Sequence, residues 1–305
     1  MRRLKKQYMQ GTKKSQVVLA LVLIATLACV SFVLWWFYKN TNIKQVETNI
    51  NPVSDTQNQE EAPAVEQQEA KTEKFDSEAL QKVVEDWASP KQTDSSRASV
   101  VLMDEDGQLI AGFKSDTEFF AASIYKLFVT YEGYRAVDAK TVNPNEVYQG
   151  GRTRMECLDL MIRESDSPCA EKMWEELGKQ ELTDTLITYG IENTSMTGLS
   201  TTAEDAGKIL ARILRGEGLS ESSRLAYLSS MKDQDALYRK GFPSGFSSEV
   251  TVYNKVGWNE QLEYHDASIL ELPDGRRLVA VVFTSGVGTS AIRDFAGRLE
   301  TALGL

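Results

Sequence analysis

An uninterrupted apolar segment stands near the start of the chain. Residues 16–38 carry no charged side chain and end in the aromatic run Trp35-Trp36-Phe37-Tyr38. At about 1.5 Å per residue, such a segment is long enough to cross a bilayer core of about 30 Å as one helix. The preceding residues 1–15 are basic and contain no acidic residue. This pattern predicts a cytoplasmic N-terminal tail and a cell-membrane protein whose body is extracytoplasmic.

A cleaved signal peptide is the alternative explanation for this segment. The apolar core of a signal peptide spans about 7–15 residues and precedes a cleavage site flanked by small residues. The run over residues 16–38 is longer, and no small-x-small site follows it before Lys39. These two differences favour an uncleaved, single-pass transmembrane helix.

A polar stretch over residues 39–75 follows this anchor. It is rich in Gln, Glu, Asn, Thr and Pro and contains few large apolar residues. Such a composition cannot bury enough apolar surface to offset the entropy lost on ordering. We therefore expect a flexible extracytoplasmic linker over residues 39–75 and one folded domain over residues 76–305.

Within residues 76–305, the order of helical and strand patterns indicates the fold class. Apolar residues recur at helical spacing after Ser77, and two strand patterns then flank the turn Asp104–Gly107. We expect strands over 98–103, 108–113, 250–255, 267–272 and 277–284, and further helices over 123–136, 155–163, 168–178, 203–215 and 290–303. Strands on both sides of a helical block predict an α+β domain, with an antiparallel sheet drawn from both ends of the domain.

Composition narrows the possible ligands. The net charge is −10, and it becomes more negative when the basic residues 1–15 are set aside. Because nucleic-acid binding relies on basic patches, we expect no nucleic-acid partner. The chain has one histidine, no Cys-x-x-Cys pair, no Walker loop and no dinucleotide fingerprint. We therefore expect neither a metal site nor a cofactor.

Two of the three cysteines, Cys157 and Cys169, lie in the expected extracytoplasmic body. Outside the cytoplasm a disulfide between them is chemically permitted, and it would pin both sides of the intervening segment Ser165-Asp166-Ser167. Two unrelated buried thiols are the alternative. We expect the disulfide.

Ser123-Ile-Tyr-Lys126 is the first of three short motifs that carry candidate chemistry. Residues three apart share a helix face, so the lysine can lie against the serine hydroxyl. If burial destabilises its ammonium, Lys126 can accept the hydroxyl proton and activate Ser123 as a nucleophile. Two further motifs, Ser165-Asp166-Ser167 and Lys255-Val256-Gly257, come later in the chain.

In this order, the motifs resemble the Ser-x-x-Lys, Ser-Asp-Asn and Lys-Thr-Gly set of class A β-lactamases and penicillin-binding proteins. The resemblance covers roughly residues 76–305. It implies a β-lactamase/transpeptidase-like fold, in which a five-stranded antiparallel sheet is flanked by terminal helices and stands beside an all-helical subdomain. In that fold the active site lies in the cleft between the two halves.

The resemblance also implies a role for each motif residue. Ser123 resembles the acylated nucleophile, while Lys126 and Ser165 resemble the residues that move protons. The implied substrate-binding residues are Asp166, Ser167, Lys255, Gly257 and Trp258, with Lys255 attracting a carboxylate and the Trp258 N–H joining that of Ser123 in the oxyanion hole.

Three departures from the family pattern affect this expectation. Ser167 replaces an asparagine that contacts the substrate, and Val256 replaces a Thr or Ser that hydrogen-bonds the substrate carboxylate. Residues 190–205 also lack the Glu-x-x-Leu-Asn setting of the deacylating glutamate, although Glu192 lies in this stretch. We therefore expect weaker carboxylate recognition and a long-lived acyl-enzyme.

The sequence thus predicts a membrane-anchored, extracytoplasmic serine hydrolase, acylated on Ser123 by a β-lactam or a peptidoglycan-type amide. A D,D-peptidase-like cell-wall enzyme acting on peptidoglycan stem peptides fits the same residues. A non-catalytic binding domain on the same fold is the alternative of another class. A Ser-His-Asp triad with His265 as base is the competing catalytic scheme, since Asp266 comes directly after that histidine.

Overall fold

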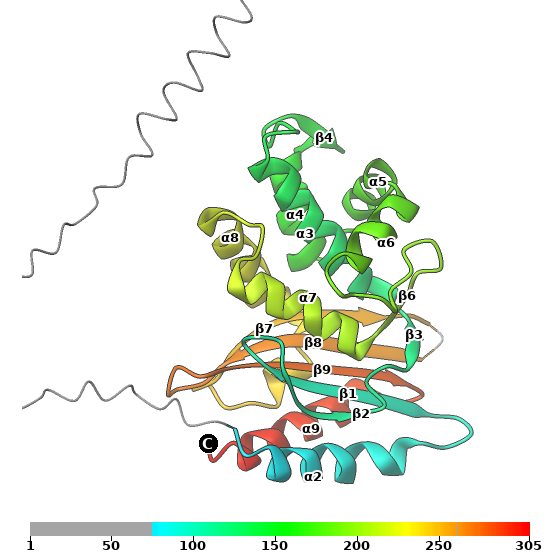
Figure 1. The fold of residues 1–305 in the computed structure, drawn as a ribbon, viewed down its shortest axis with the longest axis vertical. Helices are drawn as coiled ribbons and strands as arrows, with labels where there is room; N and C mark the ends of the chain where they lie inside the picture. Colours follow the sequence, from blue (N-terminus) through cyan, green and yellow to red (C-terminus); the bar gives the residue numbers. More distant parts are fainter. Residues whose placement is uncertain (1–74, 261) are drawn as a thin grey trace, which may run out of the picture. The chain divides into compact units, whose positions relative to one another are not determined.

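Five antiparallel strands form the centre of the fold. The computed structural model describes residues 75–260 and 262–305, and the strands of its main sheet stand in the order β2-β1-β9-β8-β7 (Figure 1). These strands are β1 (Arg97–Asp104), β2 (Leu109–Phe113), β7 (Thr251–Trp258), β8 (Glu263–Glu271) and β9 (Arg277–Ser285). The sheet combines the two ends of the domain, which confirms the predicted α+β class and the five-stranded antiparallel sheet.

Strand β9 illustrates how the sequence specifies the centre of this sheet. Val279 and Val281 lie in the apolar cluster on the helical side, whereas Ala280 and Val282 lie in the cluster beneath the terminal helices. Because side chains alternate between the two faces of a strand, an almost continuous apolar run serves both clusters. A strand with this pattern is stable only where both faces are covered.

Helices cover both faces of the sheet (Figure 1). Helices α2 (Ser77–Ala88) and α9 (Thr289–Ala302) pack on one face, and α7 (Ala203–Arg215) packs on the other. The rest of the helical half consists of α3 (Tyr125–Asp138), α4 (Arg154–Arg163), α5 (Ser167–Leu177), α6 (Lys179–Ile187) and α8 (Glu221–Lys232). Of these helices, α6 and α8 were not predicted from the apolar pattern.

Short elements bring distant segments to the nucleophile motif. Strand β3 (Glu118–Phe120) pairs with β6 (Ser200–Thr202), and β4 (Val147–Gln149) pairs with β5 (Arg152–Thr153). The described residues also contain the short 3₁₀ turns η1 (Ser89–Lys91), η2 (Ala122–Ile124), η3 (Ala236–Tyr238) and η4 (Phe242–Ser244). Ser123 therefore lies in η2, and the helix predicted to start at Ser123 begins instead at Tyr125 as α3.

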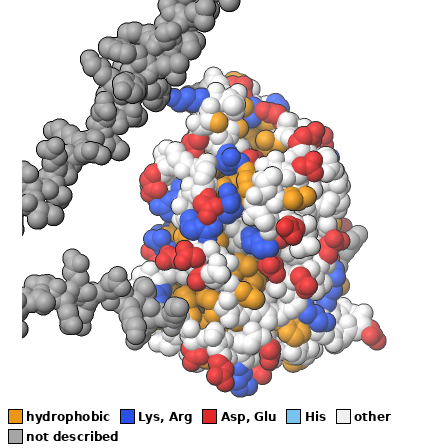
Figure 2. All heavy atoms as spheres, in the orientation of Figure 1, with side chains coloured by type: hydrophobic (Ala, Val, Ile, Leu, Met, Phe, Trp, Pro, Cys, Tyr) orange, Lys and Arg blue, Asp and Glu red, His pale blue; other side chains and the backbone are white. Residues whose placement is uncertain are grey.

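Charged side chains of both signs intermingle on the face of the domain in Figure 2. Several charged side chains of the domain are paired within one helix, as in Lys82–Asp86 of α2 at 2.7 Å and Arg298–Asp294 of α9 at 2.9 Å. Exposed pairs of this kind add little stability, because solvent screens the two charges. They leave a mixed surface on this face rather than a field of one sign.

Among residues 75–260 and 262–305, no helix is long and apolar enough to cross a membrane. The transmembrane segment predicted over residues 16–38 lies outside the described residues, as do the tail over 1–15 and nearly all of the linker over 39–75.

Candidate active site

The backbone around Ser123 is held in an unusual conformation. Ala122, directly before it, has φ 43°, in the left-handed region that a residue with a side chain rarely adopts. Such a conformation costs about 1–3 kcal/mol and is found mainly at functional sites. The Ala121 N–H donates to the Leu199 carbonyl at 2.8 Å, which ties this turn to the segment before β6.

Gly257 allows β7 to approach this turn closely. A Cβ atom at Gly257 would lie 2.9 Å from Ile124 Cγ1 and 3.0 Å from the Ala121 carbonyl oxygen. No side chain fits there without separating the strand from η2. The glycine of the third motif therefore brings the backbone of β7 against the serine of the first motif.

Two buried lysines meet at the hydroxyl of Ser165. Lys126 Nζ donates to Ser165 Oγ at 3.2 Å and to the Ser165 carbonyl at 2.6 Å. Lys255 Nζ donates to the same Oγ at 3.1 Å and to the Val256 carbonyl at 2.8 Å. Both lysines are almost fully buried, with 1% and 0% exposure. The three motifs are thus joined through one hydroxyl group.

Burial changes the acid–base properties of these lysines. It lowers the pKa of Lys126 to about 8, against the opposing effect of the negative charges of Asp166 and Glu171. It also lowers the pKa of Lys255 well below its usual value, and the positive charge of Lys126 acts in the same direction. With a pKa near 8, about a tenth of Lys126 is neutral at pH 7 and able to accept a proton.

Ser167, the third residue of the second motif, also contacts Lys126. Its Oγ accepts from Lys126 Nζ at 3.1 Å. The hydroxyl at this position therefore helps to hold the lysine in the described structure. The predicted role of Ser167 in substrate binding stays a prediction.

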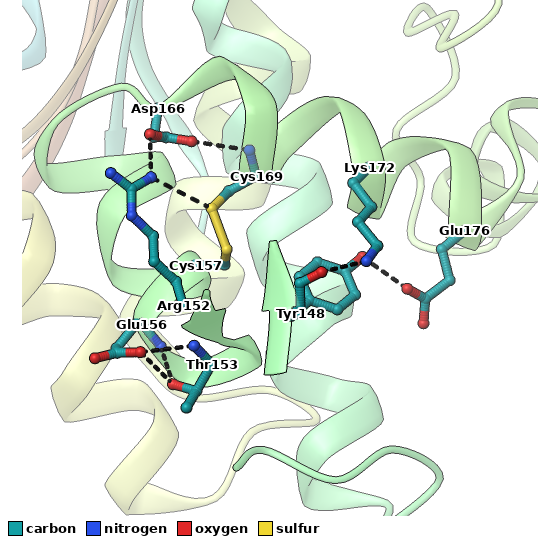
Figure 3. The surroundings of a disulfide bond; sticks show 9 residues. All are labelled: Tyr148, Arg152, Thr153, Glu156, Cys157, Asp166, Cys169, Lys172 and Glu176. Atoms are coloured by element: carbon teal, nitrogen blue, oxygen red, sulfur yellow. Dashed lines mark hydrogen bonds and ion pairs between the residues drawn. A yellow bond between two sulfur atoms is a disulfide. The ribbon is translucent and has the colours of Figure 1, made fainter. Parts of the chain in front are cut away.

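Asp166 holds the loop of the second motif in place. Its Oδ1 accepts from the Cys169 backbone N–H at 2.8 Å and caps α5, while its Oδ2 lies 2.5 Å from Arg152 Nη1. A disulfide joins Cys157 of α4 to Cys169 of α5, with the Cα atoms 5.3 Å apart (Figure 3). Both sides of the loop are therefore tied to α4 and β5. Arg152 was not foreseen as a partner.

Val256 and Trp258 lie at the edge of a hollow beside the site. The hollow has a volume of about 220 Å³, and its other lining residues include Leu237, Tyr238 and Tyr264. Trp258 is 49% exposed at the end of β7. Asp266 of β8 lies opposite Val256, and burial raises the pKa of its carboxyl group to about 6. The surroundings of Val256 therefore combine apolar groups with an acidic one.

Comparisons with known proteins agree with this geometry. Residues 77–302 match the family model Beta-lactamase2, described as the beta-lactamase enzyme family. The chain belongs to the beta-lactamase enzyme family. As a member, it is a β-lactamase-like serine hydrolase. A search of curated proteins gave no match.

The chain also resembles solved structures of similar fold, and each match covers nearly the whole length of the solved protein. PBP-A is 22% identical, with a TM-score of 0.65, and the match covers 74% of this chain and 96% of PBP-A. An ancestral class A β-lactamase (GNCA) is 20% identical, with a TM-score of 0.65 and coverages of 72% and 99%. A β-lactamase from Xanthomonas campestris pv. campestris is 19% identical, with a TM-score of 0.67 and coverages of 74% and 99%. These likenesses show the shared fold.

His265 has a structural place in this β-lactamase family member, so the Ser-His-Asp scheme is wrong. Its Nε2 lies 2.9 Å from the Phe120 carbonyl oxygen, and its Nδ1 accepts from the Thr284 backbone N–H at 3.3 Å. Both ring nitrogens are therefore occupied by the backbone. Burial lowers the pKa of His265 to about 4, so the ring is neutral at pH 7. Asp266 is the next residue of β8 and therefore points to the opposite face of the sheet.

Glu192 is the acidic residue of the stretch in which the family carries its deacylating glutamate. Its side chain is exposed and forms no hydrogen bond or ion pair with any described residue. Glu192 lies in the loop between α6 and β6, just before the turn that the bridge between Ser195 and Ser200 closes. The buried carboxylate of Asp205 holds the same loop, accepting from the Asn193 N–H at 2.7 Å.

Proposed function

We propose that this chain is a membrane-anchored, extracytoplasmic hydrolase that is acylated on Ser123 by a β-lactam or a peptidoglycan-type amide. The observation that carries the proposal is the meeting of Lys126 and Lys255 at Ser165 Oγ, beside the turn that holds Ser123. Membership of the beta-lactamase family supports it. No hydrogen bond joins Lys126 to Ser123 Oγ within the described residues, so we expect this contact to form when substrate binds.

Acylation proceeds through these groups in a defined order. The Ser123 hydroxyl attacks the amide carbonyl carbon as neutral Lys126 takes its proton. The backbone N–H groups of Ser123 and Trp258 stabilise the oxyanion. Ser165 then passes a proton to the leaving nitrogen, and its lysine partners restore that proton. An ester of Ser123 and an amine product result.

Carboxylate recognition by this site is weaker than in relatives with a hydroxyl at the position of Val256. Lys255 supplies the positive charge, but Val256 offers no hydrogen bond, and the carboxyl group of Asp266 is its neighbour across the β7–β8 pair. A hydrogen bond to a charged group contributes about 1.5–3 kcal/mol. We therefore expect slow acylation by penicillins, whose carboxylate is one of their recognition elements.

We expect a long-lived acyl-enzyme, because residues 190–205 lack the Glu-x-x-Leu-Asn setting of the deacylating glutamate and Glu192 contacts no described residue of the site. This favours a D,D-peptidase-like role in cell-wall turnover as the second candidate, in which a peptide rather than a drug is the natural acyl donor. A variant of PBP-A, a protein with a similar fold, is known as an acyl-enzyme complex with penicillin G. Penicillin is therefore a suitable first probe.

Extracytoplasmic location is supported by two independent features. The apolar segment 16–38 comes after basic residues, a pattern that favours an extracytoplasmic location for residues 39–305. The disulfide between Cys157 and Cys169 would persist in an oxidising compartment and is rare in the cytosol.

A fluorescent penicillin tests the proposal directly. The wild-type chain should be labelled covalently, whereas Ser123→Ala should not, and Lys126→Ala should be labelled at least about 100-fold more slowly. Peptide mapping of the adduct should locate it on Ser123. If wild type and Ser123→Ala are labelled equally, the non-catalytic binding domain is the better description. Release of the terminal residue from a stem-peptide analogue would favour the D,D-peptidase role.

A further inference from the structure

One carboxylate on helix α5 faces the site and has no partner among the described residues. Glu171 lies four residues after Ser167 and three before Trp174, so the three side chains share one face of α5. Ser167 Oγ contacts Lys126 Nζ at 3.1 Å, and the Trp174 ring packs against Tyr125 with centroids 5.0 Å apart. Contacts at both ends of this face direct it toward the first turn of α3. Glu171 lies between them.

The negative charge of Glu171 acts on side chains of the site. Burial is the main influence on the pKa of both Tyr125 and Lys126, and the negative charge of Glu171 adds to its raising effect on Tyr125 and opposes its lowering effect on Lys126. The carboxylate of Glu171 is therefore near these two neighbouring side chains. The other acidic residues of α5 are paired: Glu175 with Lys179 at 2.6 Å and Glu176 with Arg154 at 2.8 Å. Glu171 has no hydrogen bond or ion pair with any described residue, and its side chain is exposed to solvent. It is therefore free to bind a water molecule.

We propose that Glu171 is the general base that hydrolyses the acyl-enzyme, in place of a glutamate on the loop after α6. This inference rests on the proposed acylation of Ser123. The carboxylate of Glu171 takes one proton from a water molecule, and the water oxygen attacks the ester carbonyl carbon. The bond from that carbon to Ser123 Oγ then breaks, and the proton held by Glu171 returns to Oγ, with Lys126 as the relay. The products are a carboxylic acid and the free serine.

An exposed base explains why hydrolysis is slow without being absent. A water molecule on a solvent-exposed carboxylate is less firmly oriented than one fixed in an enclosed, pre-organised site. General-base catalysis by a positioned carboxylate still accelerates a reaction by about 10²–10⁴-fold. The residual turnover of this enzyme should therefore depend on Glu171.

The test uses the full-length chain in detergent and measures acylation and deacylation separately. Penicillin G is used to form the acyl-enzyme, excess drug is removed, and intact-mass spectrometry follows the loss of the adduct. Glu171→Gln should slow this loss about 100-fold or more. Its acylation rate should be unchanged or higher, because removal of the negative charge favours neutral Lys126. Glu171→Asp should retain part of the deacylation rate.

Glu175→Gln and Glu192→Gln are the matched controls, and both should deacylate at the wild-type rate. The proposal is overturned if Glu171→Gln deacylates like wild type, or if Glu192→Gln is the variant that stalls. Equal slowing of acylation and deacylation in Glu171→Gln, together with a lower melting temperature, would identify a structural role and also overturn it. A wild-type chain that is never acylated would refute the proposed function itself, a result distinct from all of these.

Discussion

At the scale of single residues, the protonation state of Lys126 should control acylation. Only the neutral amine accepts a proton, and burial brings its pKa to about 8. The labelling rate should therefore rise about tenfold per pH unit below pH 8 and level off above it. Lys126→Arg keeps the charge but cannot lose its proton, so it should label at least about 100-fold more slowly at every pH. A pH-independent labelling rate for wild type would contradict this role.

Val256 allows a second test at the same scale. In Val256→Thr a hydroxyl is added beside Lys255, where it can bind a substrate carboxylate. A gain of about 1.5 kcal/mol corresponds to about tenfold faster acylation by penicillin G. A penicillin whose carboxylate is blocked as an ester should show no such gain. An equal effect on both compounds would mean that the substitution acts through packing instead.

At the scale of elements, His265 fastens β3 to the main sheet. Its folded-state pKa of about 4 lies below its usual value of 6.5, so the unfolded chain binds more protons between these values. Stability is therefore fully present above about pH 6.5 and is lost as the pH falls toward 4, by about 3 kcal/mol in total. Urea unfolding from pH 4 to 7 should show this loss in wild type. His265→Phe keeps the ring contacts but has no group that titrates in this range. Its free energy of unfolding should therefore fall by about 3 kcal/mol less than that of wild type over the same pH range.

The disulfide that links α4 to α5 should also stabilise the fold. Cys157 and Cys169 are 12 residues apart, and closing a loop of this length in the unfolded chain stabilises the fold by about 3 kcal/mol. The double variant Cys157→Ser, Cys169→Ser should lose about this free energy of unfolding in urea. Wild type unfolded under reducing conditions is the control and should match it. No difference between oxidised and reduced wild type would show that the disulfide does not contribute.

Local patterns predicted the parts of this site that depend on nearby residues. The Ser123–Lys126 spacing and the motif order predicted residues that converge, and strand patterns predicted the five-stranded sheet. Contacts set by tertiary packing were not foreseen. Asp266 lies opposite Val256 only through the β7–β8 register, and Glu171 faces Lys126 only through the packing of α5 on α3. Neither relation has a signal in the spacing along the chain.

At the scale of the whole molecule, the chain should behave as a domain tethered to a membrane. The described residues 75–260 and 262–305 lie within one compact unit, so the hydrolase should not need the apolar segment in order to label with penicillin. The full chain should resist carbonate extraction from membranes, whereas a chain that lacks residues 1–38 should be soluble and still react.

Leu21→Arg with Leu27→Arg is the matched control, because each buried arginine costs about 2.5–3.5 kcal/mol of insertion free energy. This variant should lose its membrane association and, if retained in the cytoplasm, should contain reduced Cys157 and Cys169. Carbonate extraction of the wild-type chain would exclude the anchor, and a reduced cysteine pair in wild-type cells would exclude the extracytoplasmic location.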